Sequence, residues 1–298
     1  MPLSSPILAT AVIPWTPTWT FDEAAFRRQV ECIAGALTRH IYIFGTAGEG
    51  YAVTDLQFDT IASAFWRAAQ DYHFSPMLGV VSLSLPTIIA RIERGHAMGF
   101  REFQLSLPSW GALNDAELDT FFAEICGRFR DCRFHHYNLL RTKRLLTSLE
   151  YRRLAAAHPN FVAVKCSTDD PAILFDLLTV SPRLKFFFTE FGYALARRKT
   201  SEIGLLISLA TANPARAHEF VEGDDAARDV AVAELRLMGA SLREISAGRF
   251  HIDGAFDKML YRLTDSTFPL RLLPPYATAT EADFARFRDS IPARWKNS

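Results

Sequence analysis

Lys165 is the residue of this chain with the clearest potential for chemistry, because it directly follows the apolar run Phe161 to Val164. Such a run of β-branched and aromatic residues predicts a strand buried on both faces. An ammonium group is costly to bury, and desolvation lowers the pKa of a lysine until its neutral amine can attack carbonyl carbons. The simpler alternative is a lysine on the solvated rim of the strand, since charged residues are rarely fully buried.

Two other polar features follow predicted strands. A glycine-rich loop, Gly45-Thr46-Ala47-Gly48-Glu49-Gly50, comes directly after the run His40 to Phe44, and Tyr137 ends a run that begins at Arg133. Glycines allow backbone amides to close on an anion such as a carboxylate, although a plain turn is the ordinary alternative. Glu49 could be a catalytic acid or could cap nearby amides. A Walker-type phosphate loop is excluded, because no Gly-Lys-Ser/Thr follows.

Strand-like runs alternate with amphipathic helical patterns through about residue 221. The predicted strands are Ile7–Ile13, His40–Phe44, Pro76–Val81, Glu102–Leu107, Arg133–Tyr137, the Lys165 strand that begins at Phe161, Leu184–Thr189 and Gly204–Leu209. This alternation predicts an α/β fold, a (β/α)8 TIM barrel. An open doubly wound sheet is the alternative, but no GxGxxG follows the first strand. Since active sites of such barrels lie at the carboxyl ends of the strands, we expect Tyr137 and Lys165 to lie close together on neighbouring strands.

The pattern after the eighth helix is purely helical. We expect residues 1–223 to form the catalytic barrel and residues 224–298 to form a helical extension packed on it. The predicted helices of this extension are Ala226–Met238, Phe256–Leu263 and Glu281–Ser290.

The composition is that of an ordinary soluble chain, with 298 residues, 49% hydrophobic and 22% charged. Thirty-three basic residues balance 33 acidic ones, so no global field favours nucleic acid or an anionic membrane. The four cysteines, Cys32, Cys126, Cys132 and Cys166, lack CxxC spacing, which argues against zinc and a disulfide framework. With neither a membrane span nor a signal-peptide pattern at the N-terminus, we expect a cytoplasmic protein.

On these residues the chain resembles the dihydrodipicolinate synthase / N-acetylneuraminate lyase family of pyruvate-dependent class I aldolases. Gly45 to Glu49 is similar to the family's G-[ST]-T-G-E loop, Tyr137-Asn138 to its Y-N pair, and Val164-Lys165 to the strand-six lysine that forms a Schiff base. The resemblance covers most of the chain. Looser matches are Ala11–Trp15 with A-x-V-T-P-F, Arg141-Thr142 with R-T, and Gly204–Ser208 plus Asn213-Pro214 with G-x-x-S…N-x-x-P.

The resemblance implies a mechanism without metal or organic cofactor. Lys165 would attack the ketone of pyruvate or another 2-keto acid and form an imine, while Tyr137 would shuttle protons. The hydroxyl of Thr46 and the amides of Ala47 and Gly48 would hold the keto acid's carboxylate. A homotetramer or homodimer is implied in the same way.

Several positions depart from the pattern of dihydrodipicolinate synthase and narrow the range of substrates that we expect. Ala47 replaces a second hydroxyl residue, and Arg141 follows Tyr137 one residue early, without the usual proline. Trp110, in Pro108-Ser109-Trp110, replaces a relay tyrosine of the synthase. Glu190 and Phe191 lie in a tract that replaces an S-G-D-D-like turn.

Trp110 and Phe191 predict a more aromatic pocket, with plain packing as the alternative. The residues expected to select the second substrate are Trp110, Arg141, Glu190, Phe191 and Ser208.

The sequence therefore predicts a Schiff-base-forming lyase, aldolase or dehydratase whose small-molecule partners are a 2-keto acid such as pyruvate and an aldehyde or sugar acid. Two alternatives stay open. One is a true 4-hydroxy-tetrahydrodipicolinate synthase with a rebuilt relay. The other is a catalytically degenerate barrel that only binds a keto acid.

Overall fold

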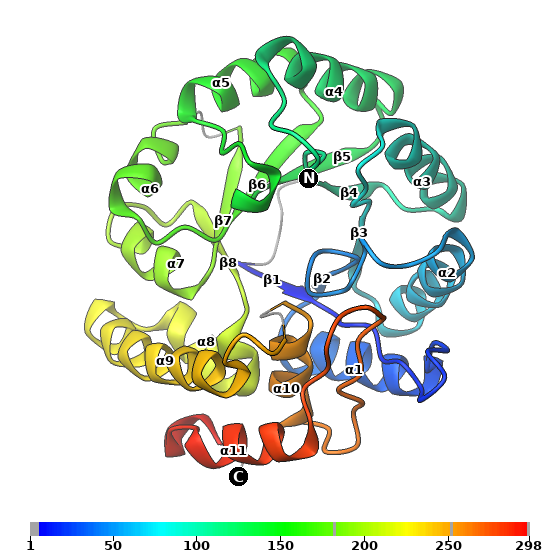
Figure 1. Ribbon diagram of the computed structural model, residues 1–298. Helices are drawn as coiled ribbons and strands as arrows, with labels where there is room; N and C mark the ends of the chain where they lie inside the picture. The colour runs from blue at the N-terminus through cyan, green and yellow to red at the C-terminus, as the bar shows by residue number, and fades with distance from the viewer. Residues whose placement is uncertain (1–5, 181–182, 251–252, 297–298) are drawn as a thin grey trace. The chain divides into compact units, whose positions relative to one another are not determined.

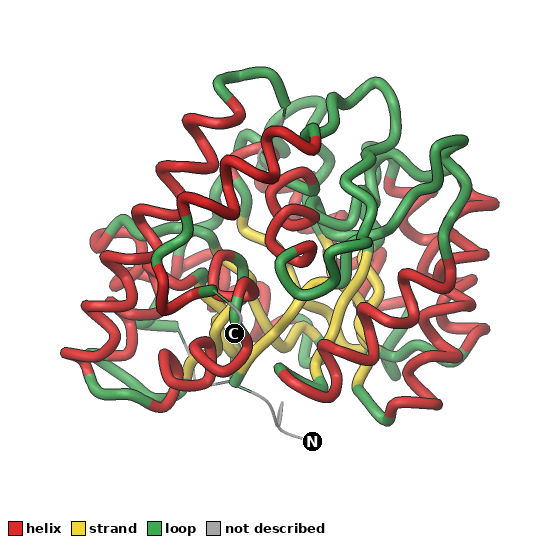
Figure 2. The backbone as a smooth tube through the Cα atoms, turned by 90° about the horizontal axis from the view of Figure 1, so that it is seen from below, coloured by secondary structure: helices red, strands yellow, loops and turns green. Residues whose placement is uncertain are grey.

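The strands of the computed structural model form a closed parallel barrel in the order β1 to β8. The structure describes residues 6–180, 183–250 and 253–296. Figure 1 labels the strands and helices, and Figure 2 draws strands in yellow and helices in red. The strands are β1 Ile7–Thr10, β2 His40–Ile43, β3 Ser75–Gly79, β4 Glu102–Leu105, β5 Arg133–Asn138, β6 Phe161–Cys166, β7 Lys185–Phe188 and β8 Ile203–Leu206.

Helices alternate with these strands and then continue alone to the end of the described chain. They are α1 Glu23–Ala36, α2 Asp55–Tyr72, α3 Leu85–Met98, α4 Asp115–Arg128, η1 Leu140–Thr142, α5 Ser148–Ala157, α6 Pro171–Leu177, α7 Glu190–Arg197, η2 Leu209–Ala212, α8 Pro214–Glu222, α9 Asp225–Ser246, α10 Ala255–Arg262, α11 Glu281–Ser290 and η3 Ala293–Trp295. The predicted TIM barrel with a C-terminal helical part is confirmed.

Four strands end two or more residues earlier than their hydrophobic pattern predicted. β1 ends at Thr10 instead of Ile13, β3 at Gly79 instead of Val81, β4 at Leu105 instead of Leu107, and β8 at Leu206 instead of Leu209. The side chains of Ala11, Val12 and Ile13 are nevertheless at most 2% exposed. Burial thus continues past the last hydrogen bond of the strand ladder. A run of apolar residues therefore predicts which residues are buried, but not where the strand ends.

The chain divides into two compact units by its internal packing. One comprises the described residues of 1–8 together with Pro76–Leu206, and the other comprises Ala9–Ser75 together with the described residues of 207–298. The boundary at residues 223 and 224 between a barrel and an extension stays a prediction.

The first unit contains the strands that carry Tyr137 and Lys165. Parallel pairing runs from β3 to β8, and Tyr137 on β5 is the Cα partner of Lys165 on β6. Figure 1 shows α3 to α7 outside these strands. The tract Thr189–Gly192, compared above with a turn, belongs largely to a helix, because Thr189 is the N-cap of α7 and Glu190 its first residue.

The second unit contains α2 and α9, the two longest helices of the described chain, each with one buried face. α2 begins with the predicted capping box of Thr54 and Gln57, which satisfies backbone amides at the start of the helix. α9 extends to Ser246, beyond the predicted Met238, because Leu242 and Ile245 continue its buried face. Arg249 then bonds Asp283 of α11 at 2.6 Å. No helix in the described ranges is long and apolar enough to cross a membrane.

Candidate active site

Lys165 lies near the carboxyl end of β6 and is fully buried, with 0% of its surface exposed. The alternative of a rim lysine is therefore wrong. Its Nζ donates a hydrogen bond to Oε1 of Gln104 on β4 at 2.5 Å. The oxygen of the carboxamide therefore faces the amine, and its nitrogen faces elsewhere.

Tyr137 lies beside Lys165, as the sequence predicted. The Nζ of Lys165 is 4.6 Å from the centroid of the Tyr137 ring, and the two residues are Cα partners across β5 and β6. A ring face at this distance attracts a cation and also shields the amine from bulk water. The structure thus joins an amine and a phenol, the two groups expected to carry the chemistry.

Further polar residues lie on the same face of the strands as this pair, nearer the amino ends of the strands. Gln104 on β4 is the Cα partner of His135 on β5, and His135 Nε2 lies 2.5 Å from Oε1 of Glu102. In TIM barrels, side chains from alternate strands share a layer, which accounts for the contact between Gln104 of β4 and Lys165 of β6. The inner wall near Lys165 is therefore polar as well as aromatic.

The prediction from sequence missed Gln104, Glu102 and His135. A signal was present in β4, where Glu102, Gln104 and Ser106 alternate with the apolar residues Phe103, Leu105 and Leu107. Strand side chains alternate between faces, so this pattern places one polar face on a strand whose other face packs against helices.

His136, between His135 and Tyr137, belongs to the opposite face of β5. Its Nδ1 lies 2.8 Å from the hydroxyl of Tyr151, and its ring packs edge-on against Phe122. Burial lowers the pKa of His136 to about 3, so this imidazole is neutral near pH 7. It contributes to packing outside the barrel wall.

The first unit also holds four of the residues expected to select the substrate. Trp110 is 85% exposed, and its backbone oxygen accepts a hydrogen bond from Lys143 Nζ at 2.8 Å. Arg141 is exposed in η1. Glu190 is buried in the first turn of α7, and Phe191 beside it is half-buried. Their role in substrate selection stays a prediction.

The glycine-rich loop belongs to the second unit, and packing requires two of its glycines, Gly48 and Gly50. A Cβ on Gly50 would lie 2.2 Å from the backbone oxygen of Phe44, and one on Gly48 would lie 2.8 Å from the Phe44 nitrogen. Thr46 is half-buried, and Ala47 joins a buried apolar cluster with Tyr261. Ser208, in the same unit, is half-buried and caps η2.

Glu49 within this loop is a buried structural anion. Its carboxylate accepts hydrogen bonds from Lys258 Nζ at 2.7 Å, Trp15 Nε1 at 2.9 Å and the Leu273 backbone nitrogen at 2.7 Å. Glu49 also has a positive φ of 55°, which costs energy for a residue other than glycine. The ion pair with Lys258 stabilises this conformation. The contacts of Glu49 are therefore those of a structural residue, and they do not match the two roles expected from the sequence, a catalytic acid or a cap of neighbouring loop amides.

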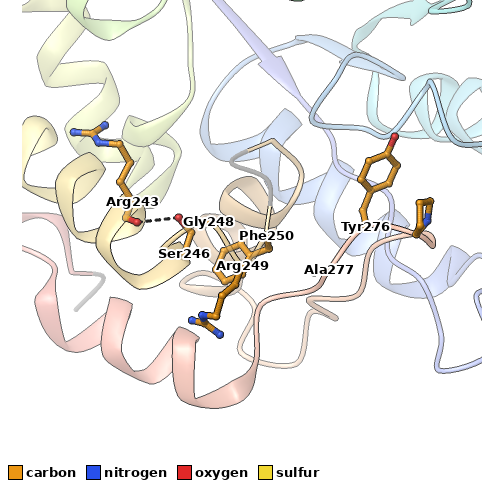
Figure 3. A pocket seen from close by; sticks show the side chains of 8 residues that line it. Arg243, Ser246, Gly248, Arg249, Phe250, Tyr276 and Ala277 are labelled. Atoms are coloured by element: carbon orange, nitrogen blue, oxygen red, sulfur yellow. Dashed lines mark hydrogen bonds between the residues drawn. The ribbon is translucent and has the colours of Figure 1, made fainter.

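A groove of about 600 Å³ lies in the second unit (Figure 3). Arg243, Ser246 and Phe250 line one side of the view in Figure 3, and Tyr276 lies across from them. Arg249 also lines the groove, but its guanidinium is paired with Asp283. None of the residues selected from the sequence lines this groove.

One group of potential metal ligands in the first unit is His96, Asp131 and Cys132. His96 Nε2 lies 2.8 Å from the Asp131 carboxylate, which also pairs with Arg101 at 3.2 Å. The Asp131 carboxylate is therefore already paired with two neighbouring basic side chains. These residues fit a surface ion-pair cluster better than a metal site.

A 4-hydroxy-tetrahydrodipicolinate synthase from Exiguobacterium sibiricum is 24% identical over 169 residues, which cover 57% of each chain. The chain thus matches little more than half the length of this relative. No family model matches it.

Solved structures share the fold over nearly the whole chain. A prophage protein of the dihydrodipicolinic acid synthase family from E. coli K12, solved with pyruvate, has a TM-score of 0.83 at 16% identity and covers 96% of this chain and 97% of its own. N-acetylneuraminate lyase from Proteus mirabilis has a TM-score of 0.82 at 13% identity, with coverages of 96% and 98%. The chain resembles the dihydrodipicolinate synthase / N-acetylneuraminate lyase family in sequence and in fold.

Proposed function

We propose that this chain is an enzyme of the dihydrodipicolinate synthase / N-acetylneuraminate lyase family, a Schiff-base-forming lyase or aldolase that acts on pyruvate or another 2-keto acid. The observation that carries the proposal is the fully buried Lys165, whose Nζ lies 4.6 Å from the Tyr137 ring centroid at the carboxyl ends of neighbouring strands. Active sites of TIM barrels lie at this end of the strands. The E. coli neighbour was solved in complex with pyruvate, which supports the choice of keto acid.

In the proposed reaction the neutral amine of Lys165 adds to the ketone carbon, and loss of water gives an imine. The imine nitrogen draws electrons from the adjacent carbon, so that C3 can lose a proton or the C3–C4 bond can break. Tyr137 carries protons to and from the reacting oxygen. Thr46 and the backbone amides of Ala47 and Gly48 are the proposed ligands of the keto acid's carboxylate.

The second substrate is proposed to be an aldehyde or a sugar acid. Arg141, Glu190, Phe191 and Ser208 are the proposed contacts that select it. The exposed Trp110 is proposed to lie at an interface of a homodimer or homotetramer. Light scattering, which measures the mass of the assembly, would test this by comparing the parent protein with Trp110→Ser. One solved neighbour is described as a monomeric dihydrodipicolinate synthase variant, so the fold alone does not fix the assembly.

Trapping with pyruvate and borohydride tests the proposal directly. We expect one reduced pyruvyl adduct, located on Lys165 by peptide mass spectrometry. Lys165→Met should abolish it, and Lys199→Met is the control, since it removes an exposed lysine that has no part in the proposed site. No mass gain, or equal labelling of Lys165→Met, would reject the proposal.

Turnover distinguishes the enzyme from its alternatives. Adduct formation without turnover of any aldehyde in a panel would favour a keto-acid-binding barrel. Condensation with aspartate semialdehyde would identify the synthase.

A further inference from the structure

Gln104 combines full burial with a hydrogen bond to the proposed nucleophile. Its side chain is 0% exposed, and its Oε1 accepts from Lys165 Nζ at 2.5 Å. Its Nε2 is buried and has no hydrogen-bond partner among the described residues. An amide hydrogen left unpaired in a protein interior costs roughly 1–3 kcal/mol, so such a group calls for an explanation.

The position of Gln104 fits a role at Lys165. The two residues come from alternate strands, β4 and β6, and reach each other across β5, which carries Tyr137. Ser106, two residues after Gln104, is 3% exposed and also has an Oγ without a partner in the described part of the chain. The segment of β4 and Ser106 therefore offers buried polar atoms without partners among the described residues, one of them on the side chain that bonds the amine.

We propose that Gln104 is a positioning and substrate-binding residue for Lys165, whose Oε1 orients the amine and whose Nε2 donates a hydrogen bond to the oxygen of the ketone under attack. This inference rests on the proposed function. A carboxamide carries no charge, so it fixes one N–H of the amine without favouring the third proton of the ammonium form, as a carboxylate would. The lone pair of the neutral amine is then available to the carbonyl carbon.

The addition step balances without any other reactant. The lone pair of Nζ forms the N–C bond, the π pair of the carbonyl moves to oxygen, and one proton passes from nitrogen to that oxygen to give the carbinolamine. Negative charge develops on the oxygen as the bond forms. A donor held in place at that point stabilises the transition state more than the ketone, and Nε2 is such a donor.

The first test measures Lys165 without substrate. The chain has only six lysines, Lys143, Lys165, Lys185, Lys199, Lys258 and Lys296, so protein labelled with 13C at lysine Cε gives a resolvable NMR titration. Lys165→Met assigns the signal. We expect Gln104→Glu to raise the pKa of Lys165 by about one unit or more, because a carboxylate favours the ammonium, and Gln104→Leu to lower it.

Gln29→Leu is the matched control, because Gln29 is also buried, at 1% exposed, and also has an unpartnered polar atom, but lies on α1. It should leave the titration of Lys165 unchanged. The other ionisable groups on the strands that carry or flank Lys165 and Gln104 are the same in all these proteins: Glu102, Arg133, His135, His136, Tyr137, Cys166 and Lys185. A difference between the variants in the pKa of Lys165 is therefore caused by the change at residue 104. An unchanged pKa in both Gln104→Glu and Gln104→Leu would overturn the orienting contact.

The second test measures the addition step. Each protein is mixed with pyruvate at a pH about two units above the measured pKa of its own Lys165, and the adduct is trapped over time with borohydride. We expect Gln104→Leu to form the adduct about 10- to 100-fold more slowly, since one donor to the developing oxyanion is lost. A rate equal to that of the parent protein would overturn the role of Nε2.

The two tests separate this inference from the proposed function. Absence of an adduct in the parent protein would reject the Schiff base. The NMR titration would still decide whether Gln104 affects the pKa of Lys165.

Discussion

Lys165 and Lys258 are both fully buried, but their surroundings differ in charge. Lys258 donates to the Glu49 carboxylate at 2.7 Å and to the Arg271 backbone oxygen. Burial lowers the pKa of Lys258 to about 8, and Glu49 opposes this shift. Lys165 instead donates to the neutral carboxamide of Gln104 and lies against a tyrosine ring.

The difference teaches that burial alone does not make a lysine reactive. A buried ammonium bonded to a carboxylate is a structural tie, and here it stabilises the loop that contains Glu49. A buried amine bonded to a neutral carboxamide has no bonded carboxylate to favour its ammonium form, so it is better suited to attack a carbonyl carbon.

The largest expected effect concerns the stability of the Lys258 region. Lys258→Met leaves the buried Glu49 carboxylate without its cation, which should cost about 3–5 kcal/mol in the free energy of unfolding, measured with denaturant. Lys165→Met should cost less, about 1–3 kcal/mol, because the group left unpaired is a neutral amide. Equal costs would remove the distinction between the two lysines.

A double variant checks the cause of this loss. Glu49→Gln combined with Lys258→Met leaves no uncompensated charge, so it should be clearly more stable than Lys258→Met alone. A double variant as unstable as the sum of its parts would show that the ion pair is not the source of the effect.

The next effect concerns turnover in the Lys165 region. Tyr137→Phe should retain the trapped imine but lower turnover by about two orders of magnitude, the usual size of a general acid/base contribution. Tyr151→Phe is the matched control, because its hydroxyl bonds His136 on the outer side of β5. Unchanged turnover in Tyr137→Phe would exclude the phenol from the mechanism.

Per pH unit, the smallest effect is an acid sensitivity next to Tyr137. The folded pKa of His136 is about 3, whereas an unfolded histidine titrates near 6.5. Between these values the unfolded chain binds the additional proton, so stability should fall as the pH falls through this window, by up to about 1.4 kcal/mol per pH unit.

Unfolding measured from pH 7 to pH 4 should therefore be less pH-dependent in His136→Gln than in the parent protein. Identical slopes in the two proteins would contradict the assignment.

Much of this organisation could be predicted from sequence because it follows local patterns. Apolar runs separated by amphipathic helical segments determined the alternation of strands and helices, and the capping box at Thr54 marked the start of α2. Consecutive strands of such a barrel are neighbours, so Tyr137 and Lys165 could be placed together from the order of the strands alone. Strand ends were less accurate, because Val12 and Ile13 stay buried beyond the last ladder bond.

The partners of the buried polar groups were decided only by the tertiary structure. Glu49 and Lys258 are 209 residues apart in the chain, and Gln104 and Lys165 are 61 apart. No local pattern encodes such distances, since a hydrogen bond between side chains depends on where whole strands and helices come to lie. The sequence by itself determined that a lysine ends a buried strand next to a tyrosine, and only the folded chain supplied the carboxamide that holds its amine.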